Sequence, residues 1–170
     1  GVQVILLFNK VDLYNKSTLF ELENLKNIYT QIGYKCISVS VISDELKELQ
    51  DIIKAKNTLI SGHSGVGKST LINKLLGTDI PTNEISLTHE QGQHTTTFSH
   101  LYKLNNGGAI IDTPGIKGFG LIDIETKDIC DLFPEFFRLK SNCKFNNCIH
   151  INEPNCKVLE ALANGEISKH

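Results

Sequence analysis

The stretch from Gly62 to Ser69 constrains this chain more than any other part of its sequence. It reads Gly-His-Ser-Gly-Val-Gly-Lys-Ser, with an apolar run (57–61) before it and a helical repeat (68–76) after it. Glycines allow a backbone to bend tightly, and a strand that turns through them into a helix directs consecutive N–H groups to one place. The sequence therefore predicts a loop that wraps a di- or triphosphate.

The polar residues of this loop have expected roles. Lys68 would reach the β- and γ-phosphates, and the Ser69 hydroxyl would hold Mg²⁺. The residues expected to contact the nucleotide here are Gly62, Ser64, Gly65, Val66, Gly67, Lys68, Ser69 and Thr70. A glycine-rich turn that binds nothing is the alternative. By itself, the loop indicates a nucleoside triphosphate and does not identify the base.

Apolar runs and helical repeats alternate along the chain. The expected strands lie at 2–8, 36–40 and 57–61, the expected helices at 18–33, 43–53, 68–76 and 157–163, and a hairpin at 101–104 and 109–112. Thr18 with Glu21 predicts the cap of the first helix, Ser43 that of the second, and Gly77 the end of the third. The alternation predicts a parallel sheet covered by helices on both faces.

Asn9-Lys10-Val11-Asp12 follows directly on the first expected strand. The Asp12 carboxylate can accept two hydrogen bonds, from N1–H and the N2 amino group of guanine, and adenine has no matching pair of donors. Asn9 can tie this loop to the phosphate loop, the stem of Lys10 can cover the base, and Ser40 ends the next strand where a further base contact is expected. The pattern predicts guanine recognition, with an accidental match in an ATP-dependent enzyme as the alternative.

Asp112-Thr113-Pro114-Gly115 ends another apolar strand. Asp112 is expected to bind Mg²⁺ through water, and the Gly115 N–H is available to the γ-phosphate. Threonines at 95–97 can supply a Mg²⁺ contact made only when the γ-phosphate is present. Counting back from the following strand favours Thr97, although threonine runs are also common in ordinary loops. The expected protein ligands of magnesium are therefore Ser69, Thr97 and Asp112.

The order of these motifs is inverted, because the base motif precedes the phosphate loop. The expected fold class is α/β, a P-loop GTPase with a circularly permuted parallel sheet. Such a permutation can keep the sheet intact, since domain termini often lie close together. The segment that begins at Asp112 then leads directly into the C-terminal region, so ordering by the γ-phosphate can be passed to it.

Four candidate metal ligands gather near the end of the sequence: Cys143, Cys148, His150 and Cys156. Three thiolates and an imidazole suit tetrahedral Zn²⁺ in a closed structural site, and free cysteines beside an incidental histidine are the alternative. With all four positions filled by protein, one Zn²⁺ would fold a small module and would not catalyse. The expected domains are a GTPase domain (1–133) and a small zinc-binding module (134–170).

Composition limits the partners and the location. The formal charge of −2 supplies no overall field for nucleic acid. No apolar run approaches the roughly 20 residues of a membrane span, and no signal peptide is visible. The cysteine pattern fits a reducing compartment. A cytoplasmic monomer without a membrane partner is expected.

Together these residues resemble the RsgA family, circularly permuted GTPases that act in maturation of the small ribosomal subunit. The resemblance rests on 9–12, 62–69, Gly92-Gln93-His94-Thr95-Thr96-Thr97, 112–115 and the four zinc ligands. It implies GTP hydrolysis stimulated by the small subunit, with ribosomal RNA as a partner. Members usually have an OB-fold RNA-binding domain before the base motif and a longer helical end after the zinc site. Neither is visible, so we expect an excised core with a truncated zinc module.

The expected reaction is attack of water on the γ-phosphate of GTP, with Lys68 and Mg²⁺ neutralising the developing charge. Ile116 stands where Ras-like proteins carry glutamine and cannot orient that water. The family pattern suggests His94 instead, and an exposed loop histidine is the alternative. The expected catalytic residues are His94, Lys68 and Thr97. A zinc RNA-binding module on an inactive nucleotide fold is the non-enzymatic rival, against which the intact phosphate and magnesium residues argue.

Overall fold

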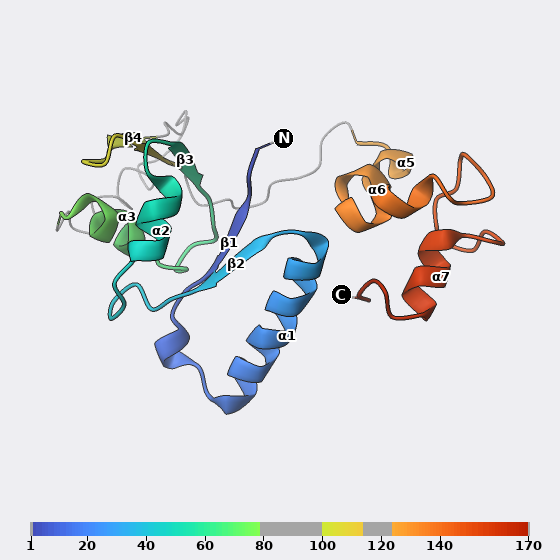
Figure 1. Ribbon diagram of the computed structural model, residues 1–170, viewed down its shortest axis with the longest axis horizontal. Helices are drawn as coiled ribbons and strands as arrows, with labels where there is room; N and C mark the ends of the chain where they lie inside the picture. Colours follow the sequence, from blue (N-terminus) through green and yellow to red (C-terminus); the bar gives the residue numbers. More distant parts are fainter. Residues whose placement is uncertain (1, 79–99, 114–123, 170) are drawn as a thin grey trace, which may run out of the picture. The chain divides into compact units, whose positions relative to one another are not determined.

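The computed structural model describes residues 2–78, 100–113 and 124–169 (Figure 1). The predictions that concern His94, Thr97 and Gly115 lie outside the described residues. The described chain forms two compact units, the first made of 2–22, 36–78 and 100–113 and the second of 23–35 and 124–169. The domain division expected from the sequence stays a prediction.

Five strands form two sheets in the described part of the chain. Their bounds are β1 (Ile5–Phe8), β2 (Lys35–Ser38), β3 (Asn57–Ile60), β4 (His100–Lys103) and β5 (Ala109–Asp112). β1 pairs with β2, and the other three strands lie in the order β3-β5-β4. β3 runs parallel to β5, with Ile60 opposite Asp112, and β4 is the antiparallel edge strand of the predicted hairpin. The register brings the end of β3, where the phosphate loop begins, beside Asp112.

The first described helices along the chain are η1 (Val11–Leu13), α1 (Lys16–Ile32), α2 (Lys47–Ile53) and α3 (Lys68–Leu76), the last of which begins at the end of the phosphate loop. The core of the first unit lies between the strands and the inner faces of α2 and α3. Ile72 of α3 and Ile110 of β5 are fully buried. Burial of an isoleucine side chain contributes about 1.5–3 kcal/mol, so these contacts hold the phosphate-loop helix against the sheet.

Two of the predicted helix starts are wrong. The Oδ1 atom of Asn15 accepts hydrogen bonds from the backbone N–H of Thr18 at 2.9 Å and from its hydroxyl at 3.1 Å. Asn15 therefore caps α1, and the predicted capping box of Thr18 and Glu21 does not form, because Thr18 is already the third residue of the helix. Likewise Ser43 does not cap α2, which follows Leu46 without a side-chain cap.

Other boundaries agree with the sequence. Gly77 ends α3 in the left-handed conformation, with φ of 66°. The last helix, α7, spans Lys157–Ala163 as predicted. Three short elements before it were not expected from the sequence, namely α5 (Thr126–Ile129), η2 (Cys130–Leu132) and α6 (Pro134–Lys140). Two of them, α5 and η2, have only 4 and 3 residues, which is too short to establish a helical repeat.

Within the second unit, Arg138 of α6 donates a hydrogen bond from Nη2 to the carbonyl oxygen of Ile32 at 2.9 Å. An arginine is well suited to this place, since the last carbonyls of a helix have no partner within the helix. The described helices include none long and apolar enough to cross a membrane.

Candidate functional site

The phosphate loop needs its glycines. Gly65 and Gly67 have φ of 81° and 92°, values that side-chain-bearing residues rarely adopt. A Cβ atom on Gly67 would collide with Nδ2 of Asn9, and one on Gly62 would lie 2.9 Å from Cγ2 of Val66. The loop is therefore closely packed against the base motif, and Lys68 begins α3 directly after it.

Asn9 joins three segments of the site, of which the sequence predicted only the link between the base motif and the phosphate loop. Its Nδ2 donates to the carbonyl oxygen of Val66 in the phosphate loop at 2.9 Å. Its Oδ1 accepts from the backbone N–H of Lys10 at 2.7 Å and of Val41 at 3.1 Å. One amide side chain thus holds the base motif, the phosphate loop and the segment after β2 in a single arrangement.

Lys10 also spans the two loops. Its Nζ donates to the carbonyl oxygen of Gly65 at 2.6 Å, and its backbone is left-handed, with φ of 65°. The two loops border a hollow of about 40 Å³, lined by Asn9, Lys10, Asp12, Ser40, Val41, Ile42, Gly67 and Thr70. All but Val41 and Ile42 are predicted site residues. Those two residues were missed because an apolar side chain does not indicate that the backbone of the residue lines a binding site.

Lys68 and Asp112 form a buried ion pair. The Nζ of Lys68 lies 3.2 Å from Oδ1 of Asp112, and it also donates to the carbonyl oxygen of Thr113. The Thr113 hydroxyl donates to the carbonyl oxygen of Ile60 at 3.0 Å and so anchors the end of β5 to the end of β3. The structure therefore brings together the lysine predicted to bind phosphate and the aspartate predicted to bind magnesium.

Asp112 has a feature that suits a cation. Only 2% of the residue is exposed, and among the described residues its Oδ2 has no hydrogen-bond partner. A buried carboxylate oxygen without a partner is costly, and a hydrated Mg²⁺ would satisfy it. Ser69, on the first turn of α3, supplies a hydroxyl from the same end of the sheet. The residues present therefore fit a magnesium ion.

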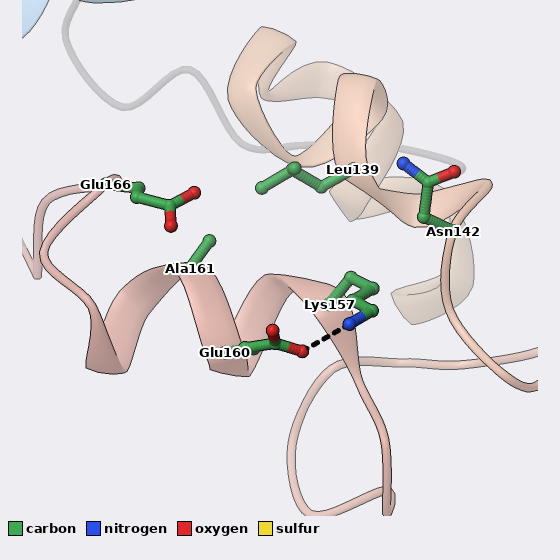
Figure 2. Close-up of a pocket in the computed structure, with 6 residues that line it drawn as sticks. All are labelled: Leu139, Asn142, Lys157, Glu160, Ala161 and Glu166. Atoms are coloured by element: carbon green, nitrogen blue, oxygen red, sulfur yellow. Dashed lines mark hydrogen bonds and ion pairs between the residues drawn. The ribbon is translucent and has the colours of Figure 1, made fainter.

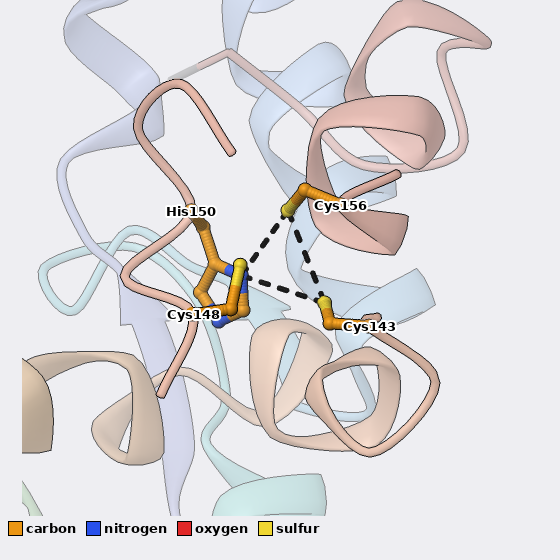
Figure 3. A group of neighbouring side chains, drawn as sticks. All are labelled: Cys143, Cys148, His150 and Cys156. Carbon is orange, nitrogen blue, oxygen red and sulfur yellow. Dashed lines mark hydrogen bonds between the residues drawn. The ribbon is translucent and has the colours of Figure 1, made fainter. Parts of the chain in front are cut away.

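The four predicted zinc ligands come together in the second unit (Figure 3). The Sγ of Cys143 lies 3.9 Å from the Sγ of Cys156 and 3.7 Å from Nδ1 of His150, and the latter two atoms are 3.2 Å apart. Cys148 completes the group, in which all ligand atoms lie within 4.8 Å of one another. Zn–S bonds of roughly 2.3 Å at tetrahedral angles give S···S distances of roughly 3.8 Å, so the cluster fits one zinc ion.

The start of α7 prepares two of these thiols for a metal. Burial acts to raise the pKa of the Cys143 thiol, but the backbone N–H groups of Lys157 and Val158 donate to it, and the net pKa is lowered. The Sγ of Cys156 accepts from the N–H of Leu159 at 3.5 Å. Burial raises the pKa of Cys148 to about 11, so this thiol would lose its proton on binding the metal.

Sequence reasoning missed Glu153, which shapes the loop that carries His150. Its Oε1 accepts from the N–H of Ile149 at 2.8 Å, and its Oε2 accepts from those of Ile151 and Asn152 at 2.9 and 3.0 Å. These bonds lower the pKa of Glu153. They also hold His150 in a left-handed conformation, with φ of 60°, that would otherwise be strained. The sequence signal that could have indicated this role is the position of Glu153 between two predicted zinc ligands, His150 and Cys156.

A second hollow, of about 220 Å³, lies between α6 and α7 (Figure 2). Leu139 and Ala161 form its apolar part, and the ion pair of Lys157 with Glu160 borders it at 2.6 Å. None of the predicted site residues lines it. It is a groove between two short helices and not part of the nucleotide or zinc site.

The sequence model of the RsgA GTPase family matches residues 1–122. The chain belongs to the RsgA GTPase family. It is 52% identical to the small ribosomal subunit biogenesis GTPase RsgA of Flavobacterium psychrophilum, over 99% of this chain and 52% of that protein. The protein of the same name from Bacteroides fragilis is 49% identical, over 99% of this chain and 55% of that protein. The chain thus spans about half the length of these curated relatives.

Solved structures agree with the family assignment. The crystal structure of YjeQ from Thermotoga maritima superposes with a TM-score of 0.79 at 33% identity, over 98% of this chain and 55% of that one. YloQ, described as a circularly permuted GTPase, superposes with a TM-score of 0.72 at 28% identity, over 97% of this chain and 52% of that one. The predicted fold class, a circularly permuted α/β GTPase fold with a small zinc-binding module, is confirmed.

Proposed function

We propose that this chain is the nucleotide-binding and zinc-binding part of a GTPase that converts GTP and water to GDP and phosphate. One observation carries the proposal: Asn9 hydrogen-bonds both the phosphate loop and the segment after β2, around a hollow that Asp12 also lines. That arrangement supports a role for Asp12 as a selective acceptor for guanine, next to a loop that would bind the phosphates. The two curated relatives above are named as GTPases, which supports the same conclusion.

The proposed contacts assign a role to each part of the site. Asp12 accepts from N1–H and the N2 amino group of guanine, and Lys10 leaves Gly65 to cover the base. The phosphate loop and the start of α3 surround the β- and γ-phosphates. Ser69 and Asp112 hold Mg²⁺, together with Thr97. Gly115 contacts the γ-phosphate, and His94 orients the attacking water.

Lys68 would change partners when the nucleotide arrives. In the described state its Nζ pairs with Asp112 and Thr113. A bound triphosphate offers stronger anionic acceptors at the start of the same helix. Bound Mg²⁺ would supply additional positive charge for the phosphate oxygens. Lys68 would then neutralise charge that develops as the bond to the γ-phosphate breaks.

We further propose that the whole protein assists late maturation of the small ribosomal subunit, as a monomer in the cytoplasm. The names of the curated relatives support this role. By the same reasoning, the subunit would stimulate hydrolysis, and the zinc-binding module would contact its ribosomal RNA. The four metal ligands in the second unit would hold one Zn²⁺ with no open coordination position, so that this metal supports structure and not chemistry.

The first experiment tests the nucleotide. When GTP, ATP and XTP compete for the protein, GTP should bind most tightly. Asp12→Asn should reduce that preference and strengthen the binding of XTP, because xanthine presents an acceptor where guanine has its N2 donor. Asp51→Asn, on the exposed face of α2, is the matched control. Preference of the unaltered chain for ATP would overturn the proposal.

The second experiment tests the ribosomal role. The GTPase rate of the full-length protein is measured with and without purified small subunits, and with large subunits as the control. We expect a marked increase with small subunits alone. An equal rate under all three conditions would contradict the proposed role in the small subunit, although GTP hydrolysis itself would stand.

A further inference from the structure

Lys74 is a half-buried lysine whose partners lie outside its own helix. It lies on α3 six residues after Lys68, and it is not among the predicted site residues. Its Nζ donates to the carbonyl oxygen of Val41 at 2.6 Å and to that of Ile42 at 3.2 Å. Because the donor is a positively charged ammonium group, these hydrogen bonds are stronger than those between neutral groups. Lys74 therefore holds a segment that lies 32 to 33 positions away in the sequence.

That segment, Ser40–Ile42, is called the base loop here. It is anchored at two other points: Asn9 accepts from the N–H of Val41 at 3.1 Å, and Oδ2 of Asp44 accepts from the N–H of Ser40 at 2.6 Å. The N–H of Asp44 returns a bond to the carbonyl oxygen of Ser40 at 2.8 Å. Asp44 thus binds both backbone groups of Ser40, Asn9 binds the N–H of Val41, and Lys74 binds the carbonyl groups of Val41 and Ile42.

The position of the base loop matters for the chemistry of guanine. Asp12 and all three residues of the base loop line the same hollow. A guanine whose N1–H and N2 groups point to Asp12 has its O6 acceptor directly beside N1. A protein group that recognises O6 must therefore stand next to Asp12, at a fixed distance from it. The base loop lines the same hollow as Asp12, and the buried Ser40 hydroxyl has no hydrogen-bond partner among the described residues, so it can donate to O6.

We propose that Lys74 is a positioning residue that holds the base loop where it recognises O6 of the guanine bound by Asp12. This inference rests on the proposed binding of guanine nucleotides. Lys74 does not touch the nucleotide. It acts through the carbonyls of Val41 and Ile42, and because it stands on the helix that begins with Lys68, it ties the base loop to the phosphate loop through one rigid element.

The test compares GDP with 6-thio-GDP, in which a weakly accepting sulfur replaces O6. Dissociation constants are measured for the unaltered chain, Lys74→Met and Lys74→Arg, with Lys54→Met as the control, since Lys54 is an exposed lysine of the same unit. Loss of the two charge-assisted hydrogen bonds in Lys74→Met should weaken the affinity for GDP by about tenfold. The penalty for sulfur in place of O6 should shrink to about twofold or less in Lys74→Met. Lys74→Arg should restore both values.

The two readouts separate a positioning role from a merely structural one. General loosening of the fold would weaken the affinities for GDP and 6-thio-GDP equally. The penalty for sulfur in place of O6 would then stay unchanged, and this result would overturn the inference. An unchanged affinity for GDP in Lys74→Met would also overturn it. If circular dichroism shows that Lys74→Met is unfolded, Lys74→Gln takes its place with the same expected outcomes, since its amide is too short to reach both carbonyls.

Failure of the proposed function would look different. If the unaltered chain bound ADP as well as GDP, guanine selectivity itself would be absent, whatever Lys74 does. If the unaltered chain prefers GDP and shows a sulfur penalty that Lys74→Met keeps in full, the proposed function stands and the role of Lys74 is wrong.

Discussion

Lys68 and Asp112 lie 3.2 Å apart between Nζ and Oδ1, and their side chains are only 12% and 1% exposed. The lysine predicted to bind phosphate is thus paired with the aspartate predicted to bind magnesium. Because the two buried charges are paired, neither stands alone in the protein interior, where an unpaired charge would be costly. The pairing also keeps the lysine at the start of α3, where the phosphates are expected.

The ion pair should contribute to the stability of the chain in the absence of nucleotide. Lys68→Met leaves the buried Asp112 carboxylate without its partner and should lower the free energy of unfolding by about 3 kcal/mol. Adding Asp112→Asn should recover most of this loss, because no charge is then left unpaired. Urea unfolding without nucleotide measures both, and Lys54→Met is the control. Additive losses in the double variant would show that the two side chains do not interact.

The zinc cluster should bind one metal ion per chain. Cys148→Ser removes a ligand and should reduce the zinc content, measured by elemental analysis after purification, to well below one equivalent. Cys130→Ser is the control, because Cys130 lies in the same unit but outside the cluster. Chelation should increase proteolysis within residues 134–169. Equal zinc content in both variants would contradict the proposed ligand set.

Glu153→Gln should weaken zinc binding while all four ligands remain. The amide keeps the shape of glutamate, but only one of its two terminal atoms can accept a hydrogen bond, so the backbone around His150 loses support. Competition with a chromogenic chelator should show an affinity about tenfold lower. Glu160→Gln, an exposed glutamate of α7, should leave the affinity unchanged. An effect of similar size in both variants would argue against a specific role.

The same carboxylate predicts a pH dependence with a definite sign. Because the backbone N–H groups lower the pKa of Glu153 in the folded state, its contribution to stability is present above the pKa of the unfolded chain, about 4.3, and is lost as the pH falls through the folded value. The difference in stability between the unaltered chain and Glu153→Gln should therefore be full at neutral pH and disappear in acid. A difference that grows as the pH falls would contradict this assignment.

The cap of α1 offers a local test of stability. Asn15→Ala removes the acceptor for two groups of Thr18 and should cost about 1 kcal/mol of unfolding free energy. Glu21→Ala should change the stability by less than about 0.5 kcal/mol, as expected of a surface position without a cap role. Thermal or urea unfolding distinguishes the two. A larger effect at Glu21 than at Asn15 would favour the capping box that the sequence suggested.

The parts of the nucleotide and zinc sites that could be predicted are those whose residues lie close together in the sequence. The loop from Gly62 to Ser69 and the base motif from Asn9 to Asp12 each combine residue types and spacing that few other functions require. The zinc ligands are close together in the sequence, so their clustering did not depend on a correct fold. Helix α7 and the hairpin of β4 and β5 were also predictable, because their apolar spacing and turn residues are local signals.

By itself, then, the sequence determined the fold class, the order of the motifs and the chemical groups of both sites, because these depend on residue type and short-range spacing. Only the tertiary structure decided which side chains hold those groups in place. Lys74 reaches the base loop because α3 packs beside it, and Glu153 binds three amides because its loop folds back on itself. Asn15 replaced the expected cap for the same reason: neighbouring candidates compete for the backbone groups, and the folded geometry selects among them.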